Sequence, residues 1–248
     1  MPADVPTIVA TSIGFRSRGR NQLDWMPGPI FDLAVELAGR PARPRICYLG
    51  TATGDAITSL SAVYGAFSGR NVDLSHLALF AMPNVADPRA HLLAQDVIWV
   101  GGGSVANLLA VWRVHGLDKV LRECWKAGVV LGGVSAGSIC WHVGGTTDSF
   151  GPDLRPVTDG LALLPYSNGV HYDSEAQRRP LYHRLIADGT LPPGYATDDG
   201  VGLVYRGTTL SEVVADRPDA AAYSVVKGPD GTAVETRLDV RRLPEPAA

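Results

Sequence analysis

Short, almost wholly apolar segments alternate with amphipathic segments along the first half of the chain, and this alternation limits the folds open to it. The segment 27–39 carries apolar side chains at i, i+3, i+4, i+7 and i+8, which is the pattern of a helix packed on a core. Continuous apolar strands joined by such helices indicate a parallel sheet covered on both faces. We therefore predict a three-layer α/β fold with a doubly wound, mostly parallel sheet. Its expected strands are Thr7–Thr11, Arg45–Thr51, Leu74–Phe80, Val97–Val100 and Val129–Leu131.

The pattern changes after Gly200, where short apolar segments follow one another with tight connections and no helix between them. Pro229, Asp230 and Gly231 form a hairpin-turn signal inside this region. We expect a C-terminal antiparallel β extension of the same domain. The prediction is one domain over residues 1–248, with a core at 5–205 and the extension at 206–242.

Composition excludes several classes of protein. The chain has 248 residues, a formal net charge of −3, 46% hydrophobic and 19% charged residues, which is too apolar and too balanced for a disordered chain. The slightly acidic balance argues against nucleic acid or an anionic membrane as a partner. The sequence leaves a homodimer open.

The cysteines and the N-terminus bear on the compartment. Cys47, Cys124 and Cys140 are far apart in apolar surroundings, with no metal-ligand spacing, which is typical of buried thiols in a reducing cytosol. Residues 1–4 show neither a basic nor a long apolar region, so no signal peptide is expected. We predict a cytoplasmic protein with no metal.

The sharpest chemical signal is the run Gly133-Val134-Ser135-Ala136-Gly137, a G-x-S-x-G pattern. It follows an expected strand and precedes a plausible helix, which is the context of a nucleophile elbow. A serine there projects from the strand end, close to the positive end of the helix. The alternative is a glycine-rich turn in which the serine merely caps the helix.

A glycine triplet, Gly101 to Gly103, ends the preceding parallel strand. Glycines permit positive φ and close approach to a ligand, so a backbone N–H there and that of Ala136 are candidates for an oxyanion hole. The alternative is a phosphate-binding loop, but the triplet has neither the spacing nor the lysine of such loops.

A serine nucleophile needs a base, and the chain has six histidines: His76, His91, His115, His142, His171 and His183. His171 follows the elbow at an expected strand end and is the favoured base, because the others lie before the elbow, in helices or facing away from it. A carboxylate should orient the imidazole. Asp199 is the first candidate, Asp198 the second and Asp148 the third; a solvated turn is the other interpretation of Asp198 and Asp199.

In combination these motifs resemble the peptidase E family of serine peptidases, which includes cyanophycinases and shares the fold of class I glutamine amidotransferases. The resemblance covers about Arg45 to Tyr205, and Ser135 lies 32 positions after Gly103 and 36 before His171. It implies that Ser135 is the nucleophile, that His171 is the base, and that Gly103 and Ala136 supply the oxyanion-hole amides. The family's acid is usually a Glu after the histidine, where this chain has Asp199. Some members have an aspartate after a T-T motif, which is Asp148 here.

The resemblance also implies a substrate class. Dipeptidases of the family cleave after an N-terminal Asp, using an Asn after the glycine triplet and an Arg beyond the histidine. This chain has Ser104 at the first position, and Arg178 and Arg179 are available to pair with a carboxylate. We expect hydrolysis of short peptides through an acyl-enzyme, with no metal or organic cofactor. The alternatives are another acyl hydrolase or amidase on the same fold, or a small-molecule binding protein without turnover.

Overall fold

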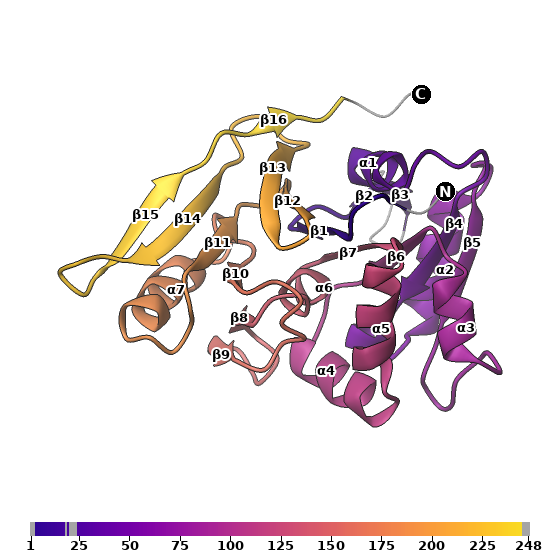
Figure 1. The fold of residues 1–248 in the computed structure, drawn as a ribbon, viewed down its shortest axis with the longest axis horizontal. Helices are drawn as coiled ribbons and strands as arrows, with labels where there is room; N and C mark the ends of the chain where they lie inside the picture. The colour runs from indigo at the N-terminus through magenta and orange to yellow at the C-terminus, as the bar shows by residue number, and fades with distance from the viewer. Residues whose placement is uncertain (1–2, 18, 20–23, 245–248) are drawn as a thin grey trace.

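The computed structural model describes residues 3–17, 19 and 24–244. Met1 and Pro2, on which part of the expectation about the N-terminus rests, lie outside the described residues. Strands alternate with helices from β4 to β7 as the sequence predicts, and two sheets lie side by side in Figure 1. The helices are α1 (Pro29–Leu37), α2 (Ile57–Phe67), α3 (Pro88–Leu93), α4 (Val105–Val114), α5 (Leu117–Lys126), α6 (Ala136–Ile139) and α7 (Arg178–Ala187), with a 3₁₀ turn η1 at Thr51–Thr53.

The larger sheet contains β1 (Thr7–Thr11), β4 (Arg45–Leu49), β5 (Asp73–Leu77), β6 (Val97–Val100), β7 (Val130–Val134), β12 (Val201–Arg206), β13 (Thr209–Ala215) and β16 (Arg241–Arg242). Their order is β16-β13-β12-β1-β7-β6-β4-β5. The five neighbouring strands β1, β7, β6, β4 and β5 run parallel. β12 pairs antiparallel with both β1 and β13. The predicted mostly parallel sheet with antiparallel additions is confirmed.

The two faces of this sheet bury alternate side chains of the same strands. On β6, Ile98 and Val100 pack with apolar side chains of α3, α4 and α5, whereas Val97 and Trp99 pack with those of α1 and α2. A parallel strand buried on both faces is apolar at every position, and this explains the unbroken run Val97–Val100. The three-layer arrangement predicted from the sequence is therefore present.

A second sheet of six strands was not predicted. It has the order β15-β14-β11-β10-β8-β9, and α7 packs against β14 and β15. Its strands are β8 (Gly144–Thr147), β9 (Arg155–Val157), β10 (Ser167–Gly169), β11 (Gly194–Thr197), β14 (Ala222–Lys227) and β15 (Ala233–Arg237). Four of them are only three or four residues long, too short to show a period in the sequence.

The C-terminal strands are divided between the two sheets. β12 and β13 extend the large sheet beside β1, and the hairpin β14–β15 extends the second sheet beside β11 (Figure 1). The ladder from β12 to β13 crosses the predicted boundary between the core, ending at 205, and the extension, beginning at 206. A separate two-stranded ribbon, β2 (Phe15–Ser17) with β3 (Trp25–Pro27), leads from β1 to α1.

Candidate active site

Ser135 lies in a sharp turn between β7 and α6. Its backbone has φ 58° and ψ −112°, a conformation that non-glycine residues adopt only under strain. Such strain costs on the order of 1–3 kcal/mol and is typical of functional turns. The serine begins a helix without capping it through its side chain, so the simple capping interpretation does not describe this residue.

Both glycines of the G-x-S-x-G run are required by the packing of this turn. A Cβ on Gly137 would collide with the carbonyl of Val100, and a Cβ on Gly133 would collide with the carbonyls of Gly137 and Val100. Because β7 and the start of α6 pass directly against the end of β6, no side chain fits at either position.

Three parallel strands end side by side at this turn. The register pairs Val100 with Gly133 and Thr11 with Val134, so the residues that follow β1 and β6 flank Ser135. The N–H of Ser135 donates to the carbonyl of Thr11 at 3.0 Å. The carboxyl ends of parallel strands are where sites form in such sheets.

The glycine triplet lies against the serine. An ideal Cβ on Gly102 would stand 3.3 Å from Cβ and 3.9 Å from Oγ of Ser135. Gly103 follows with φ 131°, and the carbonyl of Ala52 occupies the place of any side chain there. Within the described part of the chain, the N–H groups of Gly102, Gly103 and Ala136 donate to no oxygen, so all three are available to a ligand.

His171 and Asp199 come from the second sheet. His171 follows β10 and Asp199 follows β11, and these neighbouring parallel strands end together because Gly169 pairs with Ala196. Ser12, the residue after β1, connects them to the serine. Its Oγ accepts the N–H of His171 at 3.2 Å, and its carbonyl accepts the N–H of Gly200 at 3.1 Å.

Nδ1 of His171 lies 2.5 Å from Oδ1 of Asp199, and both side chains are partly buried. The hydrogen bond from His171 is the main cause that holds the pKa of Asp199 below its ordinary value, and burial opposes it. An ionised carboxylate only accepts hydrogen bonds, so Nδ1 carries a proton, and in the neutral imidazole Nε2 then has the free lone pair. Among the described residues, no hydrogen bond joins Nε2 of His171 to Oγ of Ser135. Catalytic hydrogen bonds often form only when substrate binds.

The loop that carries Asp199 has its own support. Oδ1 of Asp173 accepts the N–H of Asp199 at 2.7 Å, and Oδ2 of Asp173 accepts from Arg217 at 3.2 Å. These contacts fix the carboxylate beside the imidazole.

The two alternative acids lie in other surroundings. Oδ2 of Asp198 accepts the N–H of Ala221 at 3.0 Å, and burial raises the pKa of Asp198. Asp148 is exposed at the edge of a cavity that also contacts Glu175 and Gln177. Of the three predicted acids, the structure brings only Asp199 into contact with His171.

The two predicted substrate contacts are both engaged in internal bonds. Oγ of Ser104 accepts the N–H of Asn107 at 3.2 Å and caps α4. Arg178 is only 2% exposed, and its guanidinium donates to the carbonyl of Thr146 and to Glu175. Arg179 pairs with Glu235 at 2.6 Å.

His142 is a core residue, as its position relative to the elbow suggested. It is fully buried between the carbonyl of Ser138 (2.9 Å) and the hydroxyl of Tyr205 (3.2 Å). Burial lowers its pKa from 6.5 to about 4.

This buried imidazole makes the fold acid-sensitive. The neutral form is favoured in the folded state, so its contribution to stability is complete above about pH 6.5 and falls as the pH drops toward 4. The loss is about 3 kcal/mol of the free energy of unfolding. We expect His142→Gln to flatten this part of the pH dependence, measured by urea unfolding at about pH 7 and about pH 4.5. An unchanged slope in the variant would assign the acid sensitivity to other groups.

A cavity of about 380 Å³ opens beside the serine turn. Val134, Gly102 and Asp199 contribute to its wall, together with four aromatic side chains: Phe15, Trp25, Tyr48 and Trp99. Neither this cavity nor the role of Ser12 was predicted from the sequence. The position of Ser12 after a parallel strand was an available signal, whereas Phe15 and Trp25 belong to three-residue strands that show no pattern.

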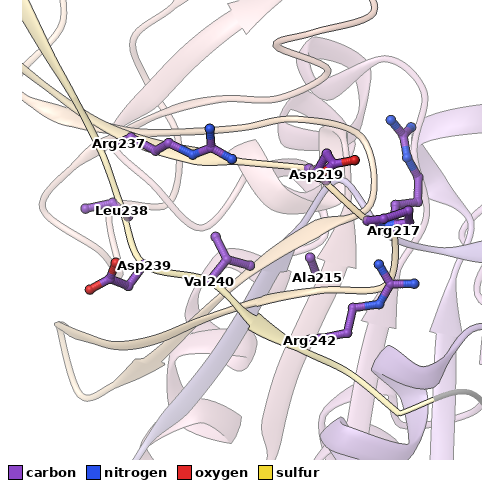
Figure 2. Close-up of a pocket in the computed structure, with 10 residues that line it drawn as sticks. Ala215, Arg217, Asp219, Arg237, Leu238, Asp239, Val240 and Arg242 are labelled. Atoms are coloured by element: carbon purple, nitrogen blue, oxygen red, sulfur yellow. The ribbon is translucent and has the colours of Figure 1, made fainter.

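Figure 2 shows a different cavity, of about 710 Å³, between the C-terminal strands. Arginine and aspartate side chains line it: Arg217, Asp219, Arg237, Asp239 and Arg242. None of the candidate catalytic residues lines this cavity.

Within the described residues, no group of three or more His, Cys, Asp or Glu side chains is arranged to hold a metal ion. No helix there is long and apolar enough to span a membrane.

An α/β sandwich with a strained serine between a parallel strand and a helix defines an enzyme class that uses a nucleophile elbow. The comparisons with known proteins give the family. The model of peptidase family S51 matches residues 27–213, and the chain belongs to that family. It is therefore a serine-type peptidase, a hydrolase.

Relatives agree with this assignment. The chain is 45% identical over 184 residues to the uncharacterized peptidase YgaJ of Bacillus subtilis (strain 168), covering 74% of this chain and 79% of that protein. It is 29% identical to peptidase E of Shewanella denitrificans over 56% of this chain and 62% of that protein. A peptidase from an acI-B1 Actinobacterium has a similar structure, with a TM-score of 0.66, 15% identity and 95% of each chain covered. These likenesses confirm the expected family and fold.

Proposed function

We propose that this peptidase hydrolyses short peptides by acyl transfer to Ser135, with His171 as general base and Asp199 as the residue that orients the imidazole. The observation that carries the proposal is the bond from Nδ1 of His171 to Asp199, which leaves Nε2 to accept a proton. Thr11 and Ser12, neighbours in sequence, anchor the backbones of Ser135 and His171 and so keep the two residues at one end of β1.

The reaction then follows two steps. Nε2 of His171 takes the proton of Ser135 as Oγ attacks the scissile carbonyl, and the oxyanion binds the N–H of Ala136 and an N–H of the glycine triplet, Gly103 in the family pattern. The C–N bond breaks as the imidazolium returns the proton to the leaving amine. A water molecule, deprotonated by His171, hydrolyses the acyl-enzyme and releases the peptide acid.

A serine-directed fluorophosphonate tests this assignment directly. The serine oxygen displaces fluoride from phosphorus, and we expect one covalent adduct on the peptide that contains Ser135, found by mass spectrometry. Ser68 is exposed and lies outside the site, so Ser68→Ala should label like the wild type. Labelling at another serine, or none in a folded protein that is given fresh probe, would contradict an activated Ser135.

A further inference from the structure

The cavity beside Ser135 has walls that suit an apolar side chain. Phe15 stacks on Trp25 with ring centroids 5.1 Å apart, and Tyr48 meets Phe15 at 6.5 Å in an edge arrangement. Phe15 and Trp25 are partly exposed, so the exposed part of each ring can contact a ligand, whereas Tyr48 and Trp99 form the buried end. A volume of about 380 Å³ is within the usual range for small-ligand sites and accommodates an aromatic or large aliphatic side chain.

The position of the cavity relates it to the acyl group of the substrate. Val134 immediately precedes the serine, and Gly102 lies against the serine side chain while also lining the cavity. Ser135 itself does not line the cavity, but an acyl group on its Oγ is adjacent to Gly102, which does. The side chain of the residue that supplies the scissile carbonyl therefore has access to the cavity.

The charge of the cavity disfavours an acidic side chain. Asp199 is the one charged residue on its wall within the described residues, and it is held ionised. Ser12 also lines it, but its hydroxyl is already bonded to Thr197 and to the N–H of His171. A carboxylate placed here would lie near the like charge of Asp199, and no cationic side chain among the described residues lines the cavity to pair with it. Placing like charges together in a protein interface costs several kcal/mol of binding free energy.

The two residues that the family resemblance suggested as contacts for an acidic side chain, Ser104 and Arg178, do not offset this repulsion. Ser104 caps α4, and Arg178 is buried and bonded to Thr146 and Glu175. Neither lines the cavity.

We infer that this chain selects peptides with an aromatic or large aliphatic side chain at the residue that donates the scissile carbonyl, and not peptides with an N-terminal aspartate. The inference rests on the proposed function of Ser135.

Dipeptides that differ only in their first residue test the inference. We expect kcat/KM for phenylalanyl-alanine and leucyl-alanine to exceed that for aspartyl-alanine by about 100-fold or more. Phe15→Ala and Trp25→Ala should lower kcat/KM for phenylalanyl-alanine by about 10-fold or more with little change for glycyl-alanine. Phe80 is half exposed and lies outside the cavity, so Phe80→Ala is the matched control.

Trp25→Arg adds a cation to the wall of the cavity. It should lower the ratio of kcat/KM for phenylalanyl-alanine to kcat/KM for aspartyl-alanine by about 10-fold or more.

A binding measurement separates failure of the inference from failure of the proposed function. Ser135→Ala keeps the cavity and does not turn over substrate, so calorimetry can compare phenylalanyl-alanine with aspartyl-alanine even if no peptide is hydrolysed. Tighter binding of phenylalanyl-alanine by about 10-fold or more supports the cavity assignment. A preference for aspartyl-alanine in turnover or binding, or equal losses on all dipeptides in the Phe15 and Trp25 variants, would overturn it. If Phe15→Ala does not fold, since Phe15 also packs on Phe31, the Trp25 variants decide.

Discussion

Ser135→Ala is expected to reduce the turnover of short peptides by about 10⁶-fold, the size seen when a serine peptidase loses its nucleophile. The reason is chemical, since the methyl group offers no oxygen to form the acyl-enzyme. The N–H groups of Gly102, Gly103 and Ala136 remain in place, so a small residual rate above that of water should persist. The measurement is a single-turnover assay on the best dipeptide of the panel, with circular dichroism to verify the fold.

The strained backbone of the serine supplies an independent control. Ser135→Gly should be equally inactive but more stable than Ser135→Ala by about 1 kcal/mol, because glycine adopts φ 58° without a steric cost. Urea unfolding of the two variants measures the difference. Retained turnover in either variant would show that Ser135 is not the nucleophile, and equal stability would show that the turn relaxes when the serine is removed.

The larger sheet could be predicted because its central strands are buried on both faces. Runs such as Val97–Val100 have no polar position, and the intervening helices carry a clear apolar stripe. The serine turn could be predicted as well, because the G-x-S-x-G run follows one of these buried strands.

The second sheet escaped prediction for a physical reason. Strands such as β10, Ser167–Gly169, consist of three small or polar residues and are stabilised by pairing with distant segments. Their alignment determines that His171 and Asp199 lie together, and the sequence could only rank Asp199 above Asp198 and Asp148. The cavity has the same origin, because Phe15, Tyr48 and Trp99 come from three separate strands.

Asp199→Asn is expected to lower kcat/KM on short peptides by about 10³- to 10⁴-fold while the fold is retained. The carboxylate accepts the Nδ1 proton of His171 at 2.5 Å and so fixes the tautomer that leaves Nε2 unprotonated. An asparagine amide turned with its N–H toward Nδ1 favours the other tautomer, in which Nε2 carries the proton and cannot accept that of Ser135. The chemical shifts of the His171 ring nitrogens, measured by NMR, report this change separately from the rate.

The neighbouring carboxylates provide matched controls for this substitution. Asp198→Asn keeps an oxygen that can accept the N–H of Ala221, and Asp148 is exposed and does not contact His171. We expect both asparagine variants to retain kcat/KM within about 10-fold of the wild type, since neither orients the imidazole. If Asp198→Asn or Asp148→Asn loses as much activity as Asp199→Asn, the orienting acid is not Asp199 alone. A small loss in Asp199→Asn, with an unchanged His171 tautomer, would mean that Ser12 and the backbone suffice to hold the histidine.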